Sequence, residues 1–259
     1  MTFVKAKKHL GQHFLKDENI AHKIVNSLSG EGYTNVLEIG PGMGVLTQFL
    51  FQEKKFETSI IDIDRESIDF LKKKFPSFEK KILEGDFLQL DLKMLFSDSF
   101  AVIGNFPYNI SSQILFKVLE NRNQVVETVG MFQKEVAERI AAKTRTKAYG
   151  ILSVLVQAFF DVDYLFTVNE NVFNPPPKVK SAVIRLRRKA NFQLGCDEKL
   201  FFDVVKTGFN QRRKMLRNGL SKFTFSEENK THKYFTQRAE ELSVAEFSEI
   251  TNWISASKK

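Results

Sequence analysis

Cysteine and long apolar runs are both scarce in this chain of 259 residues. The single cysteine, Cys196, excludes a disulfide within the chain and any zinc or iron–sulfur site built from cysteines. No apolar run approaches the ~18 residues that a membrane-spanning helix needs. The start, Met1–Lys8, leads into polar residues, so we expect no signal peptide. These absences predict a cytoplasmic protein that is not anchored in a membrane.

Acidic residues are in short supply in the second part of the chain. Lys and Arg total 39 against 31 Asp and Glu, a net charge of +8. Residues 1–100 have a net charge of −1, whereas residues 101–259 have one of +9. Such a surface suits a polyanion such as a nucleic acid, although it could also be a set of solvated faces that keep the protein soluble. The excess lies in three runs without an acidic residue, which are Arg139–Lys147, Lys178–Lys189 and Lys206–Arg217.

Hydrophobic residues make up 42% of the chain, enough for a large core. Over the first two-thirds of the chain, short apolar runs alternate with amphipathic ones. Strands that alternate with helices predict an α/β fold with a parallel sheet covered on both faces. We predict strands at Val36–Ile39, Ser59–Ile63, Ile82–Glu84, Ala101–Ile103 and Val125–Phe132, and helices at Val45–Gln52, Asp64–Phe75 and Lys134–Lys143.

The pattern changes in the last third of the chain. Val162–Val168 and Ser181–Leu186 are predicted strands on either side of the proline turn Asn174–Pro177, and they fit an antiparallel hairpin at the edge of the sheet. From Glu198 onward the spacing of apolar residues predicts helices and a small helical second domain. One apolar stripe is formed by Phe201, Val204, Val205 and Phe209, and another by Phe247, Ile250 and Ile254.

Three predicted strand ends carry groups that suit a nucleoside. The glycine-rich turn Glu38–Gly44 lies between a strand and a helix, where a ligand can approach the backbone closely and a helix N-terminus favours an anion. Asp62 stands 22 residues after Gly40, where an acid accepts hydrogen bonds from ribose hydroxyls. Asp64 competes for that role but suits a helix N-cap better. Asp86, after the third strand, could bind an adenine amino group or could be a turn residue.

The most specific motif is Asn105-Phe106-Pro107-Tyr108, which follows the fourth predicted strand. It puts a side-chain amide oxygen, a carbonyl before a stiff proline and an aromatic face within four residues. The exocyclic amino group of a nucleobase is a weak nucleophile because its lone pair is delocalised into the ring. Two acceptors can pull this nitrogen towards tetrahedral geometry while the base stacks on the aromatic ring. The motif therefore indicates chemistry on a base amino group, although a proline turn with a packed tyrosine is the alternative.

Five motifs stand in order over nearly the whole chain, and together they resemble a known family. The chain resembles the KsgA/Dim1 family of ribosomal RNA adenine N6,N6-dimethyltransferases, which use S-adenosylmethionine. Two positions depart from the family, which often has asparagine where His13 stands and leucine where Phe106 stands. His13 can still donate one hydrogen bond, so we expect its contact to survive. The five motifs are His9–Leu15, Glu38–Gly44, Asn105–Ser111, Val172–Ser181 and Phe209–Leu216.

The resemblance implies a role for individual residues. The N-terminal segment would close over the cofactor, the glycine turn would hold its methionine part, Asp62 its ribose and Asp86 its adenine. Phe173 would be a second aromatic face that sandwiches the target adenine against Tyr108. The implied cofactor site consists of Gln12, His13, Leu15, Gly40, Gly42, Asp62, Ile63, Asp86, Phe87 and Asn105, and the implied catalytic site of Asn105, Pro107, Tyr108 and Phe173.

The resemblance also implies a fold and a substrate. The fold would be a Rossmann-like class I methyltransferase domain over residues 1–189, followed by a small all-helical, rRNA-binding domain over residues 195–259. The enzyme would act as a monomer without a metal ion on the immature small ribosomal subunit, and methylate two adjacent adenosines near the 3′ end of its rRNA. Arg213 and Arg217 would share one face of a helix. We expect RNA contacts at Lys178, Arg187, Arg213, Lys214 and Arg217.

Two alternatives remain open at this point. A related group dimethylates one adenine of large-subunit rRNA and confers macrolide resistance. The segments Phe209–Lys214 and Pro175–Val179 resemble the small-subunit group more closely. A non-enzymatic assembly factor that retains the fold is the second alternative, and the intact Asn105–Tyr108 motif speaks against it.

Overall fold

The structure is a computed structural model that describes residues 4–257. These residues divide into two compact units, and each is described by itself. The first unit comprises residues 4–137 and 162–188, and the second comprises residues 138–161 and 189–257. The domain limits expected from the sequence stay a prediction. Within the described part of the chain, no helix is both long and apolar enough to cross a membrane.

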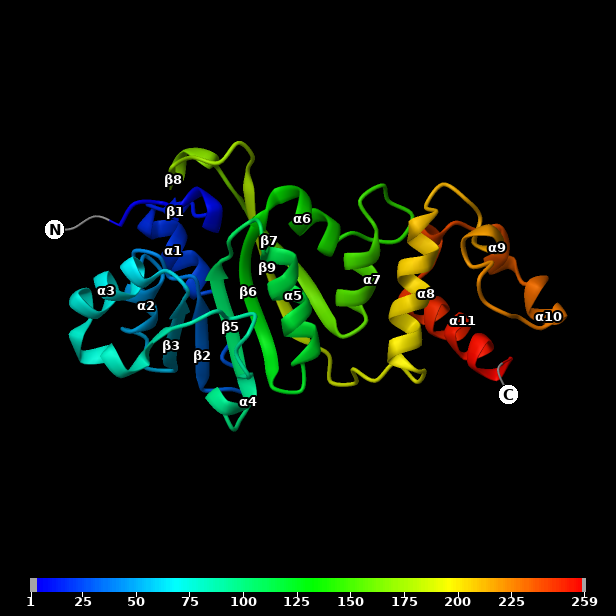
Figure 1. The fold of residues 1–259 in the computed structure, drawn as a ribbon, viewed down its shortest axis with the longest axis horizontal. Helices are drawn as coiled ribbons and strands as arrows, with labels where there is room; N and C mark the ends of the chain where they lie inside the picture. Colours follow the sequence, from blue (N-terminus) through cyan, green and yellow to red (C-terminus); the bar gives the residue numbers. More distant parts are fainter. Residues whose placement is uncertain (1–3, 258–259) are drawn as a thin grey trace. The chain divides into compact units, whose positions relative to one another are not determined.

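The first unit is built on a seven-stranded sheet, with the strand order β4-β3-β2-β5-β6-β9-β7 (Figure 1). The first five strands in this order are parallel to their neighbours, and β9 runs antiparallel to β6. This confirms the predicted α/β fold with a parallel sheet. The strands are β2 (Asn35–Ile39), β3 (Glu57–Asp62), β4 (Ile82–Glu84), β5 (Phe100–Asn105), β6 (Val125–Gln133), β7 (Phe160–Val168) and β9 (Ser181–Arg188).

Helices connect these strands, and their starts follow from the sequence. Asp64 caps α3 because its carboxylate accepts a hydrogen bond from the Glu66 amide at 3.1 Å, so the predicted N-cap is confirmed. The helix predicted at Val45–Gln52 is regular only over Thr47–Leu50. The α-helices are α1 (Glu18–Val25), α2 (Thr47–Leu50), α3 (Arg65–Lys74), α4 (Leu92–Leu95), α5 (Ser111–Glu120) and α6 (Lys134–Ile140), of which the last continues into the second unit.

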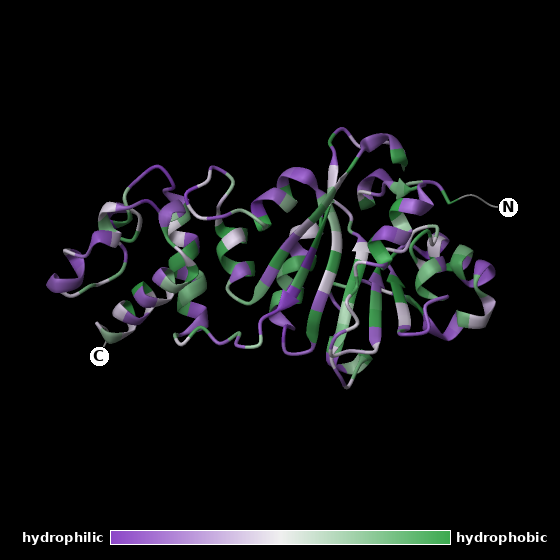
Figure 2. Ribbon diagram, turned by 180° about the vertical axis from the view of Figure 1, so that it is seen from behind, coloured by the Kyte–Doolittle hydropathy of each residue, from purple (hydrophilic) through white to green (hydrophobic). Residues whose placement is uncertain are grey.

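Apolar side chains on the strands form the core of the first unit. Ile24 of α1 packs in one buried cluster with Val36, Ile103 and Val129, which come from β2, β5 and β6. The end of the sheet at β3 and β4 packs against α3 through a separate cluster that includes Leu71. Figure 2 shows that hydrophobic residues recur along the strands of this sheet. Burial of each such side chain contributes roughly 1.5–3 kcal/mol to folding.

The sheet brings four predicted site residues to one edge. Parallel strands end at the same edge, so the residues that end or follow β2, β3, β4 and β5 meet there. These residues are Gly40, Asp62, Asp86 and Asn105. The order β4-β3-β2-β5 places the glycine turn between the two carboxylates and the Asn105 motif.

A small second sheet joins two segments that are far apart in the sequence. Strand β1 (Phe14–Leu15) pairs antiparallel with β8 (Phe173–Asn174), and Leu15 lies opposite Phe173. The sequence predicts neither strand. The pairing joins the motif His9–Leu15 to the motif Val172–Ser181, so two of the motifs that carry the resemblance lie side by side in the structure.

The second unit is helical, as predicted from Glu198 onward. The predicted apolar stripes are buried, with Phe201 and Val204 on α8 and Ile250 and Ile254 on α11. Short 3-10 helices at Lys233–Thr236 and Ala239–Glu241 lie between the longer elements. The α-helices that lie wholly in this unit are α7 (Ile151–Gln157), α8 (Glu198–Asn210), α9 (Leu216–Gly219), α10 (Glu227–Lys230) and α11 (Val244–Ala256).

One helix prediction in the second unit is wrong. The sequence predicts a continuous helix that carries Arg213, Lys214 and Arg217, but α8 ends at Asn210 and α9 begins only at Leu216. Met215 instead forms a β-bridge with Arg238, and the Leu216 amide donates to the Gln237 carbonyl at 2.8 Å. These tertiary contacts bind backbone groups that a continuous helix would use internally.

Candidate active site

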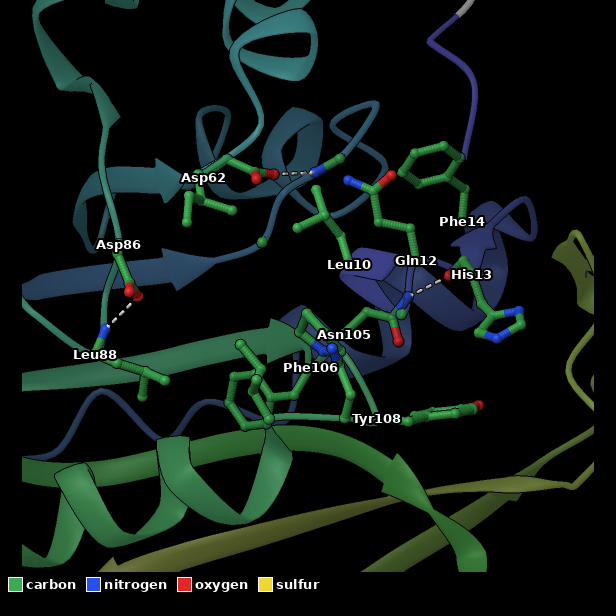
Figure 3. A pocket seen from close by; sticks show the side chains of 17 residues that line it. Leu10, Gln12, His13, Phe14, Asp62, Asp86, Leu88, Asn105, Phe106 and Tyr108 are labelled. Carbon is green, nitrogen blue, oxygen red and sulfur yellow. Dashed lines mark hydrogen bonds between the residues drawn. The ribbon is translucent and has the colours of Figure 1, made fainter. Parts of the chain in front are cut away.

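A pocket of about 170 Å³ lies at the edge of the sheet where β2, β3, β4 and β5 end. Figure 3 shows two groups of side chains around it. We call Asp62, Ile63 and Asp86 the carboxylate side, and Asn105–Tyr108 together with His13 the motif side. The predicted residues that line the pocket are Gln12, His13, Gly40, Gly42, Asp62, Ile63, Asp86, Asn105, Pro107 and Tyr108.

The glycine turn after β2 forms the floor between the two sides. Gly40 and Gly42 have φ angles of +66° and +55°, which lie in the left-handed region that favours glycine. A Cβ atom on Gly42 would lie 2.7 Å from a ring carbon of Phe14. A side chain at Gly42 would therefore displace the ring of Phe14, which lines the pocket from the N-terminal segment.

Asp62 links the glycine turn to the end of β3. Its two carboxylate oxygens accept hydrogen bonds from the amides of Gly42 at 3.3 Å and Asp64 at 2.9 Å. Burial raises the pKa of Asp62 to about 6, although these backbone hydrogen bonds lower it. The carboxylate keeps further lone pairs, so Asp62 can accept hydrogen bonds from a ligand in the pocket.

Asp64, the competing acid, is turned away from the pocket lining. Besides capping α3, its fully buried carboxylate forms an ion pair with Lys7. It also accepts a hydrogen bond from the side-chain amide nitrogen of Gln12 at 3.0 Å. Burial raises the pKa of Asp64, but the hydrogen bonds from Lys7 and Gln12 outweigh this and hold it below its ordinary value. Asp64 thus fastens the N-terminal segment, whereas Asp62 faces the pocket.

Asp86 and its neighbours complete the carboxylate side. One Asp86 oxygen accepts a hydrogen bond from the Leu88 amide at 2.8 Å, which stiffens the turn after β4. Ile63 is 55% exposed beside Asp62, so an apolar ring could cover it.

The side chain of Phe87 is buried and lies outside the lining, with the Lys117 ammonium 5.6 Å from its ring centre. Only the backbone of Phe87 is left for a cofactor role.

Asn105, the last residue of β5, is oriented by the N-terminal segment. Its amide nitrogen donates to the carbonyl oxygen of His13 at 2.8 Å (Figure 3). This bond fixes the side-chain amide so that its oxygen, an acceptor, is available to a ligand. The arrangement matches the predicted need for an acceptor at this position.

Tyr108 is held on one face and at its hydroxyl. The imidazole of His13 stacks on the ring, with 5.3 Å between ring centres and 29° between planes. The Tyr108 hydroxyl lies 2.6 Å from the hydroxyl of Ser181, the first residue of β9. His13 is itself held through Nδ1, which lies 2.8 Å from the carbonyl oxygen of Pro175. The sequence gives no signal for any of these contacts.

Besides Phe87, two predicted site residues are not brought to the pocket. Leu15 is buried in the core beneath the β1–β8 pair. Phe173, the expected second aromatic face, is 1% exposed and packs in the same core. It lies opposite Leu15 across this pair, which is why its ring turns inward. In this conformation Phe173 therefore offers no free face to a base.

The residues predicted to bind RNA differ in whether their charged groups form ion pairs within the protein. Arg213, Lys214 and Arg217 are exposed on the second unit. Lys178 is exposed on the first unit, whereas Arg187 forms an ion pair with Asp163 at 3.4 Å. Arg212, next to the cluster, is paired with Glu240 at 2.6 Å.

One buried acid was not predicted as a functional residue. Glu38 in β2 is 1% exposed and accepts a hydrogen bond from the Thr47 hydroxyl at 2.6 Å. Burial raises the pKa of Glu38 to about 8, the bond from Thr47 lowers it, and the nearby Asp62 raises it. At neutral pH this side chain is therefore mainly protonated and fixes the start of the glycine turn as a neutral acid.

Comparisons with known proteins show the family to which this chain belongs. Residues 3–256 match the family described as ribosomal RNA adenine dimethylase. Ribosomal RNA small subunit methyltransferase A from Cytophaga hutchinsonii is 59% identical to the chain over 256 residues, which cover 98% of this chain and 99% of that protein. The protein of the same name from Flavobacterium johnsoniae is 56% identical over 257 residues, covering 99% and 98% of the two chains.

Solved structures agree as well. A dimethyladenosine transferase from Plasmodium falciparum has a TM-score of 0.79 and 27% identity, over 95% of this chain and 98% of that one. The 23S rRNA methyltransferase ErmE has a TM-score of 0.69 and 24% identity over 92% and 99%, which shows a shared fold. The Rossmann-like methyltransferase fold expected from the sequence is thus confirmed. The chain belongs to the ribosomal RNA adenine dimethylase family.

Proposed function

We propose that this chain transfers methyl groups from S-adenosylmethionine to N6 of two adjacent adenosines near the 3′ end of small-subunit rRNA. The names of its relatives support the small subunit as the substrate. The observation that carries the proposal is the motif side of the pocket. There an acceptor oxygen of Asn105 and the ring of Tyr108 line the same pocket as two strand-end carboxylates, an arrangement suited to a nucleoside donor and a nucleobase acceptor.

The carboxylate side fits the proposed cofactor. S-adenosylmethionine supplies a methyl group on a positively charged sulfur, which is already activated for transfer. Asp62 would accept hydrogen bonds from the ribose hydroxyls, and Asp86 one from the adenine amino group. Ile63 would pack on the adenine ring, and the glycine turn, which lines the pocket at Gly40 and Gly42, would lie against the methionine part. Gln12 and His13 of the N-terminal segment and the backbone of Phe87 would complete the cofactor site, and Leu15, whose side chain is buried in the core, would contribute only its backbone.

The motif side would position the target amine. The side-chain oxygen of Asn105 and the backbone carbonyl of Phe106 would accept hydrogen bonds from the two N6 hydrogens. Pro107 stiffens the turn and so holds the Phe106 carbonyl in place. Tyr108 would stack on the base. We retain Phe173 as a second stacking face, which requires its ring to leave the core when the base enters. Such positioning would raise the rate of methyl transfer chiefly by holding the amine at a reactive distance and angle to the methyl group.

Exposed basic residues would hold the RNA through its phosphates. We assign this role to Arg213, Lys214 and Arg217 on the second unit, and to Lys178 and Arg187 on the first. Arg187 would have to share its charge with Asp163. Such contacts recognise the shape of the RNA rather than its sequence. We expect the protein to act as a cytoplasmic monomer and without a metal ion.

A methyl-transfer assay tests the proposal. The purified protein is incubated with S-adenosylmethionine that carries a labelled methyl group and with unmethylated immature small or large ribosomal subunits. Digestion and mass spectrometry should find labelled N6,N6-dimethyladenosine in small-subunit rRNA only. Label in large-subunit rRNA alone would favour the macrolide-resistance group, and no label in either would favour a non-enzymatic assembly factor.

A further inference from the structure

Ser181 is a polar residue with an unusual location for its type. It is the first residue of β9, which lies between β6 and the edge strand β7; it is 0% exposed and lies opposite Gln133 of β6. Its hydroxyl reaches 2.6 Å from the hydroxyl of Tyr108, which lies 73 positions away in the sequence. A buried hydroxyl needs a partner, and Tyr108 supplies it.

The bond determines how the Tyr108 ring is held. The backbone of Tyr108 lies in a turn, where its carbonyl accepts a hydrogen bond from the Ser111 hydroxyl at 3.3 Å. The ring itself can still rotate about its two side-chain bonds. His13 contacts one face of the ring, and Ser181 holds the opposite end through the hydroxyl. An anchor at both places leaves one orientation of the ring plane.

The ionisation of Tyr108 is consistent with such an anchor. Burial raises the pKa of the Tyr108 hydroxyl, and the hydrogen bond with Ser181 lowers it by less. The phenol therefore stays protonated at neutral pH, so one hydroxyl of the pair donates and the other accepts. Neither side chain has to ionise for the contact to persist.

We propose that Ser181 is a positioning residue, whose hydroxyl fixes the direction in which the Tyr108 ring points while His13 fixes the ring plane, so that the ring is ready to stack on the target adenine. The inference rests on the proposed function, in which Tyr108 is the stacking face. Stacking weakens when the planes of the two rings are no longer parallel, so a free Tyr108 ring would bind the base less well and misdirect its amine. Ser181 acts through Tyr108 and need not touch the substrate.

A double-mutant cycle tests this assignment. Ser181→Ala should lower kcat/KM for methylation of small-subunit rRNA about 10-fold, the effect of one lost buried hydrogen bond. The Kd for S-adenosylmethionine should stay within about twofold, since Ser181 lies outside the pocket lining. Tyr108→Phe removes the other hydroxyl and should have a similar effect. The two changes combined should cost no more than either alone, because they break the same bond.

A matched control separates positioning from general damage to the sheet. Thr128 of β6 is 1% exposed, and its hydroxyl has no hydrogen-bond partner. Thr128→Val removes a buried hydroxyl from a neighbouring strand and should leave kcat/KM unchanged. If Ser181→Ala stays within twofold of the active wild type, or if its effect adds fully to that of Tyr108→Phe, the inference is wrong.

A spectroscopic readout tests Ser181 without relying on methyl transfer. The chain has five tyrosines, so tyrosine-selective NMR labelling gives few signals, and Tyr108→Phe identifies the one from Tyr108. Ser181→Ala should shift or broaden the Tyr108 ring signal, whereas Thr128→Val should leave it in place. An unchanged Tyr108 signal in Ser181→Ala contradicts the inference. An inactive wild type would instead overturn the proposed function, and the NMR test of Ser181 would still apply.

Discussion

The two sides of the pocket are held in place by different kinds of contact. On the carboxylate side, Asp62 and Asp86 accept hydrogen bonds from backbone amides that lie 2 to 20 positions away. On the motif side, Asn105, Tyr108 and His13 are held by partners 73 to 162 positions away. The first side is thus built from local turns, and the second from segments that only the complete fold brings together.

This difference suggests that the two sides have separable tasks. A change on the carboxylate side should first weaken cofactor binding, whereas a change on the motif side should first slow methyl transfer. The N-terminal segment is fastened at two places, because the Gln12 side chain contacts Asp64, which lies outside the pocket lining, and the His13 carbonyl contacts Asn105 on the motif side.

The largest effect is expected on the motif side. Asn105→Ala removes the acceptor for the amine and should lower the rate of methyl transfer about 100-fold or more. Losses of this size are typical when an enzyme loses one group that positions or polarises its substrate. The Kd for S-adenosylmethionine, measured by calorimetry, should change only a few-fold. Transfer at nearly the wild-type rate would refute the assignment of Asn105, and a complete loss of cofactor binding would move this residue to the cofactor site.

The opposite pattern is expected on the carboxylate side. Asp62→Ala should weaken cofactor binding by roughly 10- to 150-fold, because hydrogen bonds from ribose to a charged acceptor contribute on the order of 1.5–3 kcal/mol. The rate of transfer at saturating cofactor should fall less than in Asn105→Ala. Asp64→Ala is the comparison variant, since Asp64 fastens the N-terminal segment without lining the pocket. A larger loss of affinity in Asp64→Ala would show that the ribose acid is Asp64.

These two acids also show what can be predicted from sequence. The glycine turn, the strand ends and the N-cap at Asp64 are encoded within a few residues of each other, so local spacing predicts them. The Ser181–Tyr108 contact and the β1–β8 pair have no local signal. For the same reason the inward turn of Phe173 could not be predicted, because it depends on the strand that pairs beside it.

The helix predicted through Arg213 fails for a related reason. Its composition is compatible with a helix, but the β-bridge of Met215 with Arg238 requires extended backbone at that point. Propensity is a weak guide wherever a tertiary contact competes for the same backbone groups. The burial of the apolar stripe on α8, by contrast, follows directly from its spacing.

A pH-dependent effect is expected for the glycine turn on the carboxylate side. Glu38 has a pKa of about 8 in the folded protein, against 4.5 when unperturbed. Between these values the folded state holds a proton that the unfolded chain has lost, so the free energy of unfolding should fall as the pH rises through this window. The total fall attributable to Glu38 should be a few kcal/mol, at about 1.4 kcal/mol per pKa unit.

Glu38→Gln, which cannot titrate, isolates this contribution. Urea unfolding should show a smaller loss of stability for the variant than for the wild type as the pH rises from about 7 to about 8, where Asp62, with a pKa of about 6, is already mostly ionised. Equal losses in both proteins would mean that Glu38 is already ionised at neutral pH.

The smallest effect is expected away from both sides of the pocket. Replacing Arg213, Lys214 and Arg217 by neutral residues should weaken binding to the rRNA particle and leave the cofactor Kd unchanged. Each lost phosphate contact should reduce the slope of log affinity against log salt by roughly 0.7–0.9. Lys54, Lys55 and Lys80, which are exposed on the first unit, provide a charge-matched control. An unchanged slope would mean that the cluster is a solvated face, and the run Lys178–Lys189 would be tested next.

Mass spectrometry of the 3′ end of small-subunit rRNA from living cells tests the central claim most directly. The rRNA is compared between cells with the gene, cells without it, and deleted cells that express either the wild type or Asn105→Ala. We predict that two adjacent N6,N6-dimethyladenosines disappear on deletion, return with the wild type and fail to return with Asn105→Ala. Dimethylated adenosines that persist in the deleted cells, or that Asn105→Ala restores in full, would contradict the account.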